Sequence, residues 1–383
     1  MGYKIRNQLD ESTLLESAEG DYRIEPGAPS GAVQENISQS AVRDLRLSLA
    51  LLQSQAEEIV SRAAQLAESL RRPLELADDL SAGGVDLVEN FGHGAAATSI
   101  PRWHFSMLND KERNDALVVA VERQVRPGAH VLDIGSGTGL LAMAAIRAGA
   151  ARVTTCEMNP MLAEIARQTI ADHGMSDVIT VLGKRSTDVV VGRDIEDRAD
   201  LLISEIVDCG LIGEGILPSV RHAREHLLRP GADISPLSGR IFGQLVQSEA
   251  IAGLNHVSNA AGYDVSLVNV AATRGHFPVR LHTWPHQMLS APVELTAFDF
   301  VAGDLGPGTS TPEFAVTADG RAVGLVVWFE LDLGAGVTLR NSPENLSSHW
   351  MQAFIPHPEP LDVTRGDRVS TTLEWTDDRL YLR

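Results

Sequence analysis

Lysine is nearly missing from this chain of 383 residues, and cysteine is almost as rare. Only Lys4, Lys111 and Lys184 represent lysine among 32 basic residues, a composition typical of GC-rich bacteria. The two cysteines, Cys156 and Cys209, cannot build a disulfide framework. Clusters of His and Cys at ligand spacing are also missing, so we expect no structural zinc and no other bound metal.

Long apolar runs and an excess of positive charge are absent too. No uncharged stretch approaches the ~20 residues that cross a bilayer, and the amino terminus has no apolar signal segment, so we expect a cytoplasmic protein. The formal charge of -19 repels nucleic acids and anionic membranes and favours cationic small molecules or peptides as partners. With 44% hydrophobic residues, the chain is long enough for two globular domains and an appendage.

The first 93 residues differ in texture from the rest. Residues 1–35 mix charges with Gly, Pro and Ser and predict a flexible arm. Residues 36–93 predict a helical extension, because apolar residues recur at spacings of four and three before Pro73: Leu45, Leu49, Leu52, Ala56, Ile59, Ala63, Leu66 and Leu70. This seam must be buried, either within its own domain or by self-association, and the pattern leaves both open.

Two further domains follow, 94–235 and 236–383, with Pro236 as a natural boundary. In the first, strand-like HVLDIGSG, ARVTTCEM, VITVLGK and ADLLISEI alternate with helical stretches such as PMLAEIARQTIADHG, which predicts a parallel α/β sheet covered on both faces. In the second, alternating segments such as RIFGQLVQSE, VELTAFDF, AVGLVVWFELDL and RVSTTLEWT predict an antiparallel sandwich or barrel.

A glycine-rich turn directly after the first strand is the most specific local signal. In VLDIGSGTG, Gly135, Gly137 and Gly139 allow close backbone approach of a ligand before a helix start, and Glu157 ends the next strand, where it can bind ribose hydroxyls. The spacing is not the dinucleotide pattern, and Asp133 would repel a pyrophosphate but suits the ammonium of S-adenosylmethionine. A plain glycine turn within an α/β core is the alternative.

Two carboxylates follow the fourth strand, in the segment SEIVDCGLIGEG. Glu205 ends a strand that should lie beside the first strand, and Glu214 returns after nine residues. A pair of carboxylates facing each other matches the planar fork of a guanidinium. Two unrelated surface acids would have the same spacing, so the sequence leaves both interpretations open.

This loop resembles the double-glutamate loop of the protein arginine methyltransferases. Ser348, His349 and Trp350 resemble that family's Thr-His-Trp loop, and RWHFSMLNDKERN resembles the segment before its cofactor strand. The resemblance runs from about residue 100 to the carboxyl end and is strongest to the monomethylating type III branch, as in GLIGEGILPS. It implies a Rossmann-like S-adenosylmethionine-dependent methyltransferase domain followed by a β-barrel substrate domain.

The resemblance also implies roles for individual residues. For the cofactor, Arg113 would pair with its carboxylate, Glu157 would bind the ribose, and Met107 would shape the space beside the methyl group, while three residues would line the adenine: Lys184, Arg185 and Ser186. For the substrate, Glu205 and Glu214 would bind the guanidinium and Trp350 would form a wall of its slot. Asp110 and His349 would pair across the two domains as a proton relay, although an ordinary buried histidine would look the same in sequence.

The sequence also departs from the family. GAAAT at 94–98 replaces the aromatic entry motif, and the family's dimerisation arm corresponds to a short, bland segment at 250–263. The missing aromatic motif, the extra amino-terminal helical piece and the bacterial composition favour free L-arginine as substrate. In this the chain resembles the bacterial branch that methylates free L-arginine in natural-product pathways similar to that of streptozotocin. A protein arginine methyltransferase acting on Arg-rich tails is the alternative.

Two further classes stay open: a methyltransferase acting on hydroxyls or amines, and a silent scaffold. We expect a homodimer, no nucleic-acid partner and no membrane association.

Overall fold

The computed structural model describes residues 100–383 and, of the preceding part, only Val60. The chain divides into two compact units, residues 1–86 and 87–383, and the described range belongs to the second. The predicted flexible arm, the seam from Leu45 to Leu70 and the segment at 94–98 lie outside the described residues, apart from Val60, which is helical and exposed. Within the described part, no helix is long and apolar enough to span a membrane.

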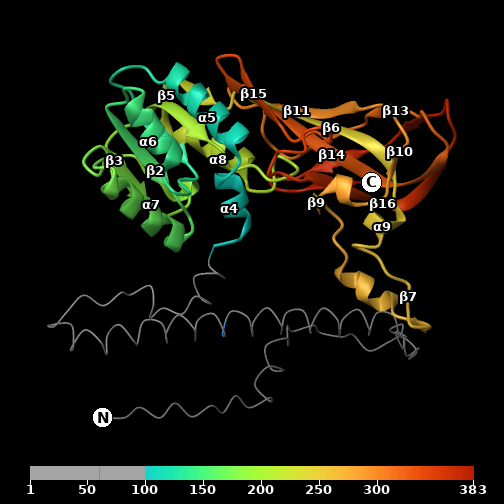
Figure 1. Cartoon of the computed structure of the whole chain (residues 1–383). Helices are drawn as coiled ribbons and strands as arrows, with labels where there is room; N and C mark the ends of the chain where they lie inside the picture. The colour runs from blue at the N-terminus through green and yellow to red at the C-terminus, as the bar shows by residue number, and fades with distance from the viewer. Residues whose placement is uncertain (1–59, 61–99) are drawn as a thin grey trace, which may run out of the picture. The chain divides into compact units, whose positions relative to one another are not determined.

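The first half of the described range is a parallel α/β sheet (Figure 1). Its strand order is β3-β2-β1-β4-β5, with β1 paired to β2 on one side and to β4 on the other. The strands are β1 (His130–Ile134), β2 (Arg152–Cys156), β3 (Ile179–Leu182), β4 (Ala199–Ser204) and β5 (Leu228–Ser235). Every residue of β1 is buried, as a central parallel strand requires.

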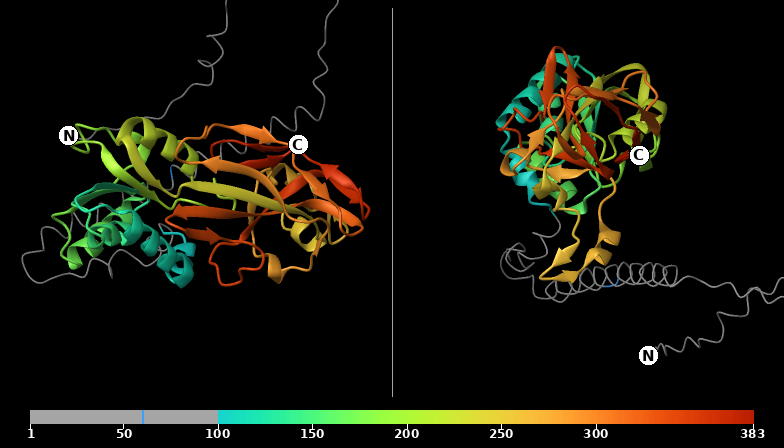
Figure 2. Two further views of the ribbon diagram at one scale, coloured as in Figure 1. Left: turned by 90° about the horizontal axis from the view of Figure 1, so that it is seen from above. Right: turned by 90° about the vertical axis from the view of Figure 1, so that its right-hand side faces the viewer.

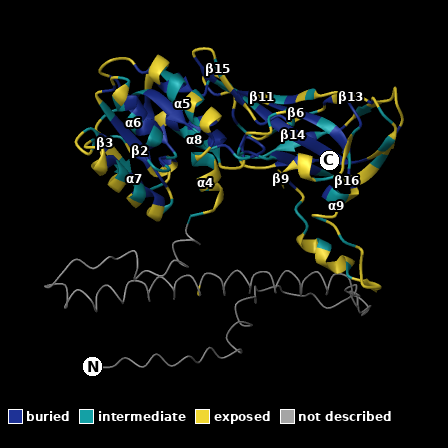
Figure 3. Cartoon of the chain, in the orientation of Figure 1, coloured by how far each residue is buried: buried dark blue, intermediate teal, exposed yellow. Residues whose placement is uncertain are grey.

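Helices pack around this sheet and turn their polar faces outward (Figure 3). They are α4 (Trp103–Leu108), α5 (Lys111–Gln124), α6 (Leu140–Arg147), α7 (Pro160–Asp172) and α8 (Ile216–His222), with the short turns η2 (Ser186–Asp188) and η3 (Ala223–Leu227). Local chemistry sets their starts: Asp110 caps α5 through the amide of Arg113, and Asn159 caps α7 just before Pro160.

The second half is a curled antiparallel β domain, so the predicted order of a Rossmann-like sheet followed by a barrel-like domain is confirmed (Figure 2). Its main sheet pairs β10-β6-β14-β16-β9, with β11 on β6 and β15 on β14. These strands are β6 (Ser238–Gln247), β9 (Phe277–Val279), β10 (Gln287–Met288), β11 (Val293–Asp299), β14 (Gly320–Gly334), β15 (Val337–Arg340) and β16 (Gln352–Val363).

Shorter strands complete the domain. They form β12-β18-β19 and β13-β17: β12 (Gly308–Ser310), β13 (Glu313–Ala315), β17 (Arg368–Ser370), β18 (Leu373–Trp375) and β19 (Leu380–Leu382). RVSTTLEWT, expected as one strand, is therefore divided between β17 and β18. Strands β5 and β16 were not expected at all.

A protruding segment lies between β6 and β9 (Figure 1). It contains α9 (Glu249–Ala252), β7 (Asn259–Ala260), β8 (Tyr263–Asp264) and η4 (Ser266–Ala271), followed after β9 by η5 (Leu281–Thr283). Reciprocal side-chain bonds join its two limbs, Asn255 to Thr273 and Asn269 to Val257. The segment expected to be short and bland is thus a folded projection, which we call the arm (residues 249–273).

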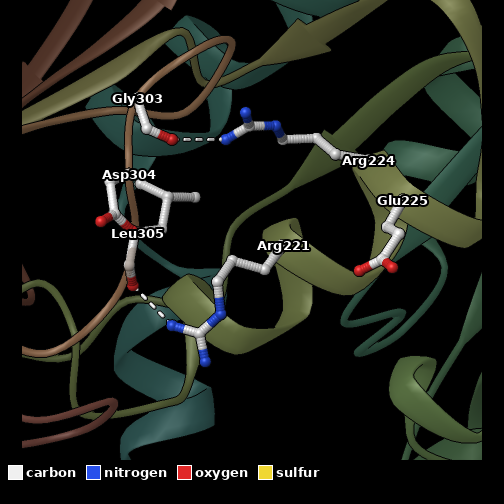
Figure 4. Close-up of a pocket in the computed structure, with 6 residues that line it drawn as sticks. All are labelled: Arg221, Arg224, Glu225, Gly303, Asp304 and Leu305. Carbon is white, nitrogen blue, oxygen red and sulfur yellow. Dashed lines mark hydrogen bonds between the residues drawn. The ribbon is translucent and has the colours of Figure 1, made fainter.

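One hydrophobic core runs through both halves and joins them. Polar contacts reinforce the junction. Gln124 on α5 donates to the carbonyl of Leu333 at 2.8 Å. Arg221 donates to the carbonyl of Leu305 at 2.6 Å and Arg224 to that of Gly303 at 2.8 Å, and Figure 4 shows both guanidinium groups reaching across to this turn. These hydrogen bonds therefore fix the connected segments of the two halves relative to each other.

Candidate active site

The glycine loop and the end of β2 form one hydrogen-bonded unit. Gly135, Gly137 and Gly139 all have positive φ angles, and a Cβ at Gly135 would lie 2.5 Å from Ile206. The buried carboxylate of Glu157 accepts the amide of Gly137 at 3.1 Å and that of Asn159 at 2.8 Å. The predicted ribose ligand is thus fixed beside the loop predicted to approach the cofactor.

Two buried polar atoms near the strand ends lack a partner among the described residues: Oδ1 of Asp133 and Nε of Arg113. The other oxygen of Asp133 accepts the hydroxyl of Thr155 at 2.6 Å. Burial raises the pKa of Asp133 to about 7, with Glu157 adding to the effect and Thr155 opposing it. One free acceptor and one free donor complement an ammonium and a carboxylate, so these residues fit the amino-acid portion of S-adenosylmethionine.

The residues predicted around the adenine have different environments. Ser186 is buried at the start of η2, Arg185 is exposed, and Lys184 forms an ion pair with Asp194 at 2.7 Å. Met107 is half-buried on α4, a helix with no fully buried residue. All four lie in the described range, where no hydrogen bond or ion pair joins them to the glycine loop.

Glu205 binds the guanidinium of Arg113 in this structure, and Glu214 acts on the same group by its charge. Nη2 of Arg113 forms a buried ion pair with Glu205, and Nη1 donates to Asn114 at 2.7 Å. Burial lowers the pKa of Arg113 to about 10, and Asp110 and Glu214 oppose this by their charge. The two glutamates therefore act on one cation, although Arg113 was expected to pair with the cofactor carboxylate.

Glu214 is close to other acids. Its side chain is exposed to solvent, yet desolvation by the surrounding protein, together with Asp208 and Glu157, raises its pKa to about 7 against the opposing charge of Arg113. A carboxylate with such a pKa changes charge in the physiological range. It can hold a cation when ionised and release it when protonated.

Asp110 and His349 are paired across the two halves of the fold. Oδ2 of Asp110 accepts the amide of His349 at 2.8 Å and its Nδ1 at 2.9 Å, while Oδ1 accepts the amide of Arg113. Burial opposes ionisation of Asp110, but these bonds outweigh it and lower its pKa. Burial lowers the pKa of His349, with Asp110 opposing. The pairing orients the ring and leaves Nε2 for other partners.

Trp350 borders this cluster. It is buried, its ring lies against His349 with centroids 4.3 Å apart, and the guanidinium carbon of Arg113 is 5.9 Å from its ring centroid. The indole Nε1 donates to the carbonyl of Val207 at 3.1 Å, within the loop that carries the two glutamates. The structure thus brings together Asp110, Arg113, Glu205, His349 and Trp350.

The second domain holds this glutamate loop at two more points that the sequence did not indicate. Asn341 donates to the carbonyl of Cys209 at 3.1 Å, and His276 contacts Asp208 at 2.6 Å. These partners are separated by 132 and 68 positions along the chain. Neither belongs to a motif, so only the pairing of distant segments reveals them.

Comparisons with known proteins give a consistent picture. Residues 116–221 match the family described as ribosomal protein L11 methyltransferase, and residues 239–381 match the arginine methyltransferase oligomerization subdomain. Arginine N(omega)-methyltransferase of Streptomyces achromogenes subsp. streptozoticus is 54% identical over 87% of this chain and 90% of its own length.

Eukaryotic relatives are more distant and longer. Protein arginine N-methyltransferase 1.6 of Arabidopsis thaliana is 32% identical over 70% of this chain, and protein arginine N-methyltransferase 7 of Xenopus laevis is 31% identical over 77%. The aligned parts cover 41% and 47% of these two proteins, so the chain spans less than half of each.

Among solved structures, a Trypanosoma brucei PRMT1 enzyme–prozyme heterotetrameric complex with AdoHcy matches with a TM-score of 0.62 and 26% identity, covering 71% of this chain and 86% of that one. Protein arginine methyltransferase 10 of Arabidopsis thaliana matches with a TM-score of 0.58 and 20% identity, over 72% and 88% of the two chains, which supports the fold alone.

Proposed function

Because the chain belongs to the protein arginine methyltransferase family, we propose that it transfers one methyl group from S-adenosylmethionine to a terminal nitrogen of free L-arginine. The chain is an S-adenosylmethionine-dependent arginine N-methyltransferase. The observation that carries the choice of free arginine is the 54% identity to the Streptomyces enzyme over nearly the full length of both, against 30–32% to the eukaryotic protein arginine methyltransferases 1.6 and 7. A role in bacterial secondary metabolism fits the same relative.

The arrangement around Arg113 supports binding of a guanidinium. Glu205 is ion-paired with one guanidinium already, and Glu214 acts on it by charge. Two carboxylates around a substrate guanidinium would orient it, draw positive charge towards themselves and leave one terminal nitrogen free. They would also offset the repulsion between the cationic substrate and a sulfonium. Glu205 and Glu214 are therefore the residues on which activity should depend most.

Cofactor binding is assigned to the glycine loop and its neighbours. S-adenosylmethionine supplies an electrophilic methyl group when bound. Glu157 would hold the ribose, Asp133 the ammonium and Arg113 the carboxylate, in keeping with the free acceptor and donor on the last two. Lys184, Arg185 and Ser186 would line the adenine. Met107 would border the transferred methyl.

Proton loss from the methylated guanidinium needs a path out of the site. The pair Asp110–His349 lies beside Arg113 and Trp350. The lowered pKa of His349 favours a neutral imidazole that can accept a proton. Trp350 would form an apolar wall that excludes water from the slot. A buried histidine that merely joins the two halves would keep its orientation but would contribute nothing to the pH dependence of the rate.

Self-association is proposed through the arm. The matched oligomerization subdomain includes this segment, and five of its large apolar residues are exposed: Leu254, Tyr263, Leu267, Val268 and Val270. Exposed apolar residues gathered on a projection are typical of an interaction surface. A homodimer follows as the proposed assembly, and the seam at 45–70 is a second candidate that lies outside the described residues.

One experiment tests the substrate. The purified protein is incubated with methyl-labelled S-adenosylmethionine and either free L-arginine or an Arg-rich peptide, and the products are measured by mass spectrometry. We expect free arginine to gain one methyl group and the peptide to gain none. Labelling of the peptide alone would favour the protein methyltransferase, and a product with two methyl groups would contradict monomethylation.

A further inference from the structure

The glutamate loop contains a third acid, Asp208, which sits between Glu205 and Glu214 and contacts the second domain through His276. We propose that Asp208 and His276 are a positioning pair that fixes Glu214 for binding of the substrate guanidinium. The inference rests on the proposed function of Glu214. Both are positioning residues, because nothing places them in contact with a reacting atom.

Asp208 organises the loop from within. Its Oδ1 accepts the amide of Gly210 at 3.1 Å and that of Gly213 at 2.8 Å, so the carboxylate ties down the residue directly before Glu214. Burial opposes ionisation of Asp208, but the bonds from His276 and the two amides outweigh it and lower its pKa. An ionised Asp208 is therefore the form that holds the loop.

His276 connects this carboxylate to strand β19. Its Nδ1 accepts the amide of Leu380 at 3.1 Å, so the proton of the neutral ring must be on Nε2, which donates to Oδ2 of Asp208 at 2.6 Å. The amide of His276 in turn donates to the carbonyl of Leu380 at 3.0 Å. Both ring nitrogens are used, and the imidazole has one fixed orientation.

Steric limits show that the sequence is adapted to this pair. A Cβ at Gly213 would lie 2.2 Å from Asp208, and a Cβ at Gly210 would lie 2.6 Å from the ring of His276. Both glycines of DCGLIG therefore have a specific reason to lack a side chain. The loop can form the Asp208–His276 contact in this shape only while both positions are glycine.

A bound metal is a less suitable explanation for the same residues. One donor atom each from Asp208, Cys209 and His276 lies within 4.8 Å of the others. However, His276 has no free lone pair while Nδ1 accepts an amide and Nε2 donates to Asp208. Burial raises the pKa of Cys209 well above its usual value, which disfavours the thiolate that ligates metals.

Asp208 has a second effect on Glu214, through its charge. The groups that act on Glu214 are Asp208 in its own loop, Glu157 after β2 and Arg113 on α5. Asp208 and Glu157 disfavour its ionised form, and Arg113 favours it. Removal of the Asp208 charge therefore makes Glu214 easier to ionise, an effect that a purely structural role would not have.

The first test separates orientation from folding by two substitutions of one residue. His276→Leu removes both ring contacts, whereas His276→Gln keeps a donor for Asp208. We expect H276L to raise KM for arginine about tenfold or more while KM for S-adenosylmethionine stays within about twofold, and H276Q to restore most of the loss. His130→Gln, which removes an equally buried imidazole hydrogen-bonded to Thr154, is the matched control and should leave KM for arginine unchanged.

The second test measures the charge. Asp208→Asn should move the acid limb of kcat/KM for arginine to lower pH by about half a unit to one unit. The ionisation of Glu214 is also measured directly, by NMR titration of protein with 13C-labelled glutamate, with Glu214→Gln assigning its signal. In D208N without substrate, the pH midpoint of the Glu214 titration should be lower than in the parent protein.

The outcomes distinguish this inference from the proposed function. If arginine is not methylated but the Glu214 midpoint falls in D208N and its signal shifts in H276L, the proposed function is wrong and the pair still positions Glu214. The pair has no positioning role if arginine is methylated but H276L and D208N change none of three quantities: KM for arginine, the acid limb of kcat/KM and the NMR signal of Glu214. The positioning role would also be overturned if H276L and H276Q lost the same share of activity and that share matched the fraction of protein that fails to fold.

Discussion

Glu214 and Glu205 have different surroundings in this structure. Its pKa is raised to about 7, whereas Glu205 is ion-paired with Arg113. The charge of Glu214 therefore changes near neutral pH, whereas Glu205 already has a cationic partner. Arginine binding should therefore follow the ionisation of Glu214.

This difference predicts the pH dependence of the rate. We expect kcat/KM for arginine to increase with pH and to level off above about 7, because only ionised Glu214 binds the cation. Glu214→Gln should lower kcat/KM about 100-fold or more and abolish this acid limb, since one of the two carboxylates that bind the guanidinium is lost. Glu225→Gln, which removes a charge from the surface near α8, is the control. An unchanged limb in E214Q would assign it to another group.

We expect ionised Asp133 to favour binding of the cofactor but to destabilise the fold. Its pKa of about 7 lies above the ordinary 3.8. The free energy of unfolding therefore decreases as pH increases from about 4 to about 7, and above pH 7 the whole destabilisation is present. Asp133→Asn should raise the free energy of unfolding at pH 8 by up to about 4 kcal/mol, with little change at pH 4.

The same substitution should weaken S-adenosylmethionine binding, because an amide cannot pair with the ammonium. Urea unfolding at both pH values and calorimetric titration of the cofactor measure the two effects. Asp172→Asn, an exposed site on α7, is the control for both. Unchanged affinity in D133N would remove Asp133 from the cofactor site.

Helix α5 shows how one side chain can serve both folding and the site. Asp110 is the N-cap of α5 and also holds His349, so its loss affects the helix start and the junction at once. A serine at this position can still accept the amide of Arg113, but it is too short to replace both carboxylate oxygens. The two contributions can therefore be measured separately.

We expect Asp110→Ala to lower the free energy of unfolding by about 2–4 kcal/mol, through loss of the cap and of the buried contacts to His349. Asp110→Ser should recover about 1 kcal/mol, the usual contribution of an N-cap, without recovering kcat. Denaturant unfolding and steady-state kinetics measure the two. If D110S restores kcat as well, the role of Asp110 is confined to capping.

Elements with a regular pattern were predictable, and those without one were not. Strands β1 to β4 follow from buried apolar runs, and α6 and α7 from helical periodicity. Strand β5 was missed because it contains Pro230 and Gly231, and its exposed residues 229–231 interrupt the apolar pattern. Strand β16 was missed because Pro356 and Pro358 interrupt it.

The same limit applies to the site. Glycine spacing and acidic pairs indicated Gly135, Glu157, Glu205 and Glu214, because their chemistry needs a local pattern. Asp208 and His276 meet only through the packing of two domains, so no local spacing marks them. The arm was misjudged for a related reason: three of its five exposed large apolar residues, Leu267, Val268 and Val270, lie beyond the stretch at 250–263 that looked bland.

Assembly of two copies is the property that the arm predicts. Leu267 and Val268 are exposed on η4 of the arm. We expect L267E/V268E to shift a dimer to a monomer in light scattering after gel filtration, because charges at an apolar interface are strongly unfavourable. The fold should stay intact, as judged by circular dichroism.

Val301→Glu, an exposed apolar residue outside the arm, is the matched control and should leave the dimer unchanged. A dimer that persists in L267E/V268E would contradict an arm interface. Loss of the dimer after charged substitutions at Leu52 and Leu66 would then assign self-association to the seam at 45–70. Comparing kcat of the monomeric variant with that of the parent shows whether activity depends on assembly. His276, Asn341 and Trp350 bind the Glu205–Glu214 loop within one chain, so we expect the monomer to retain kcat.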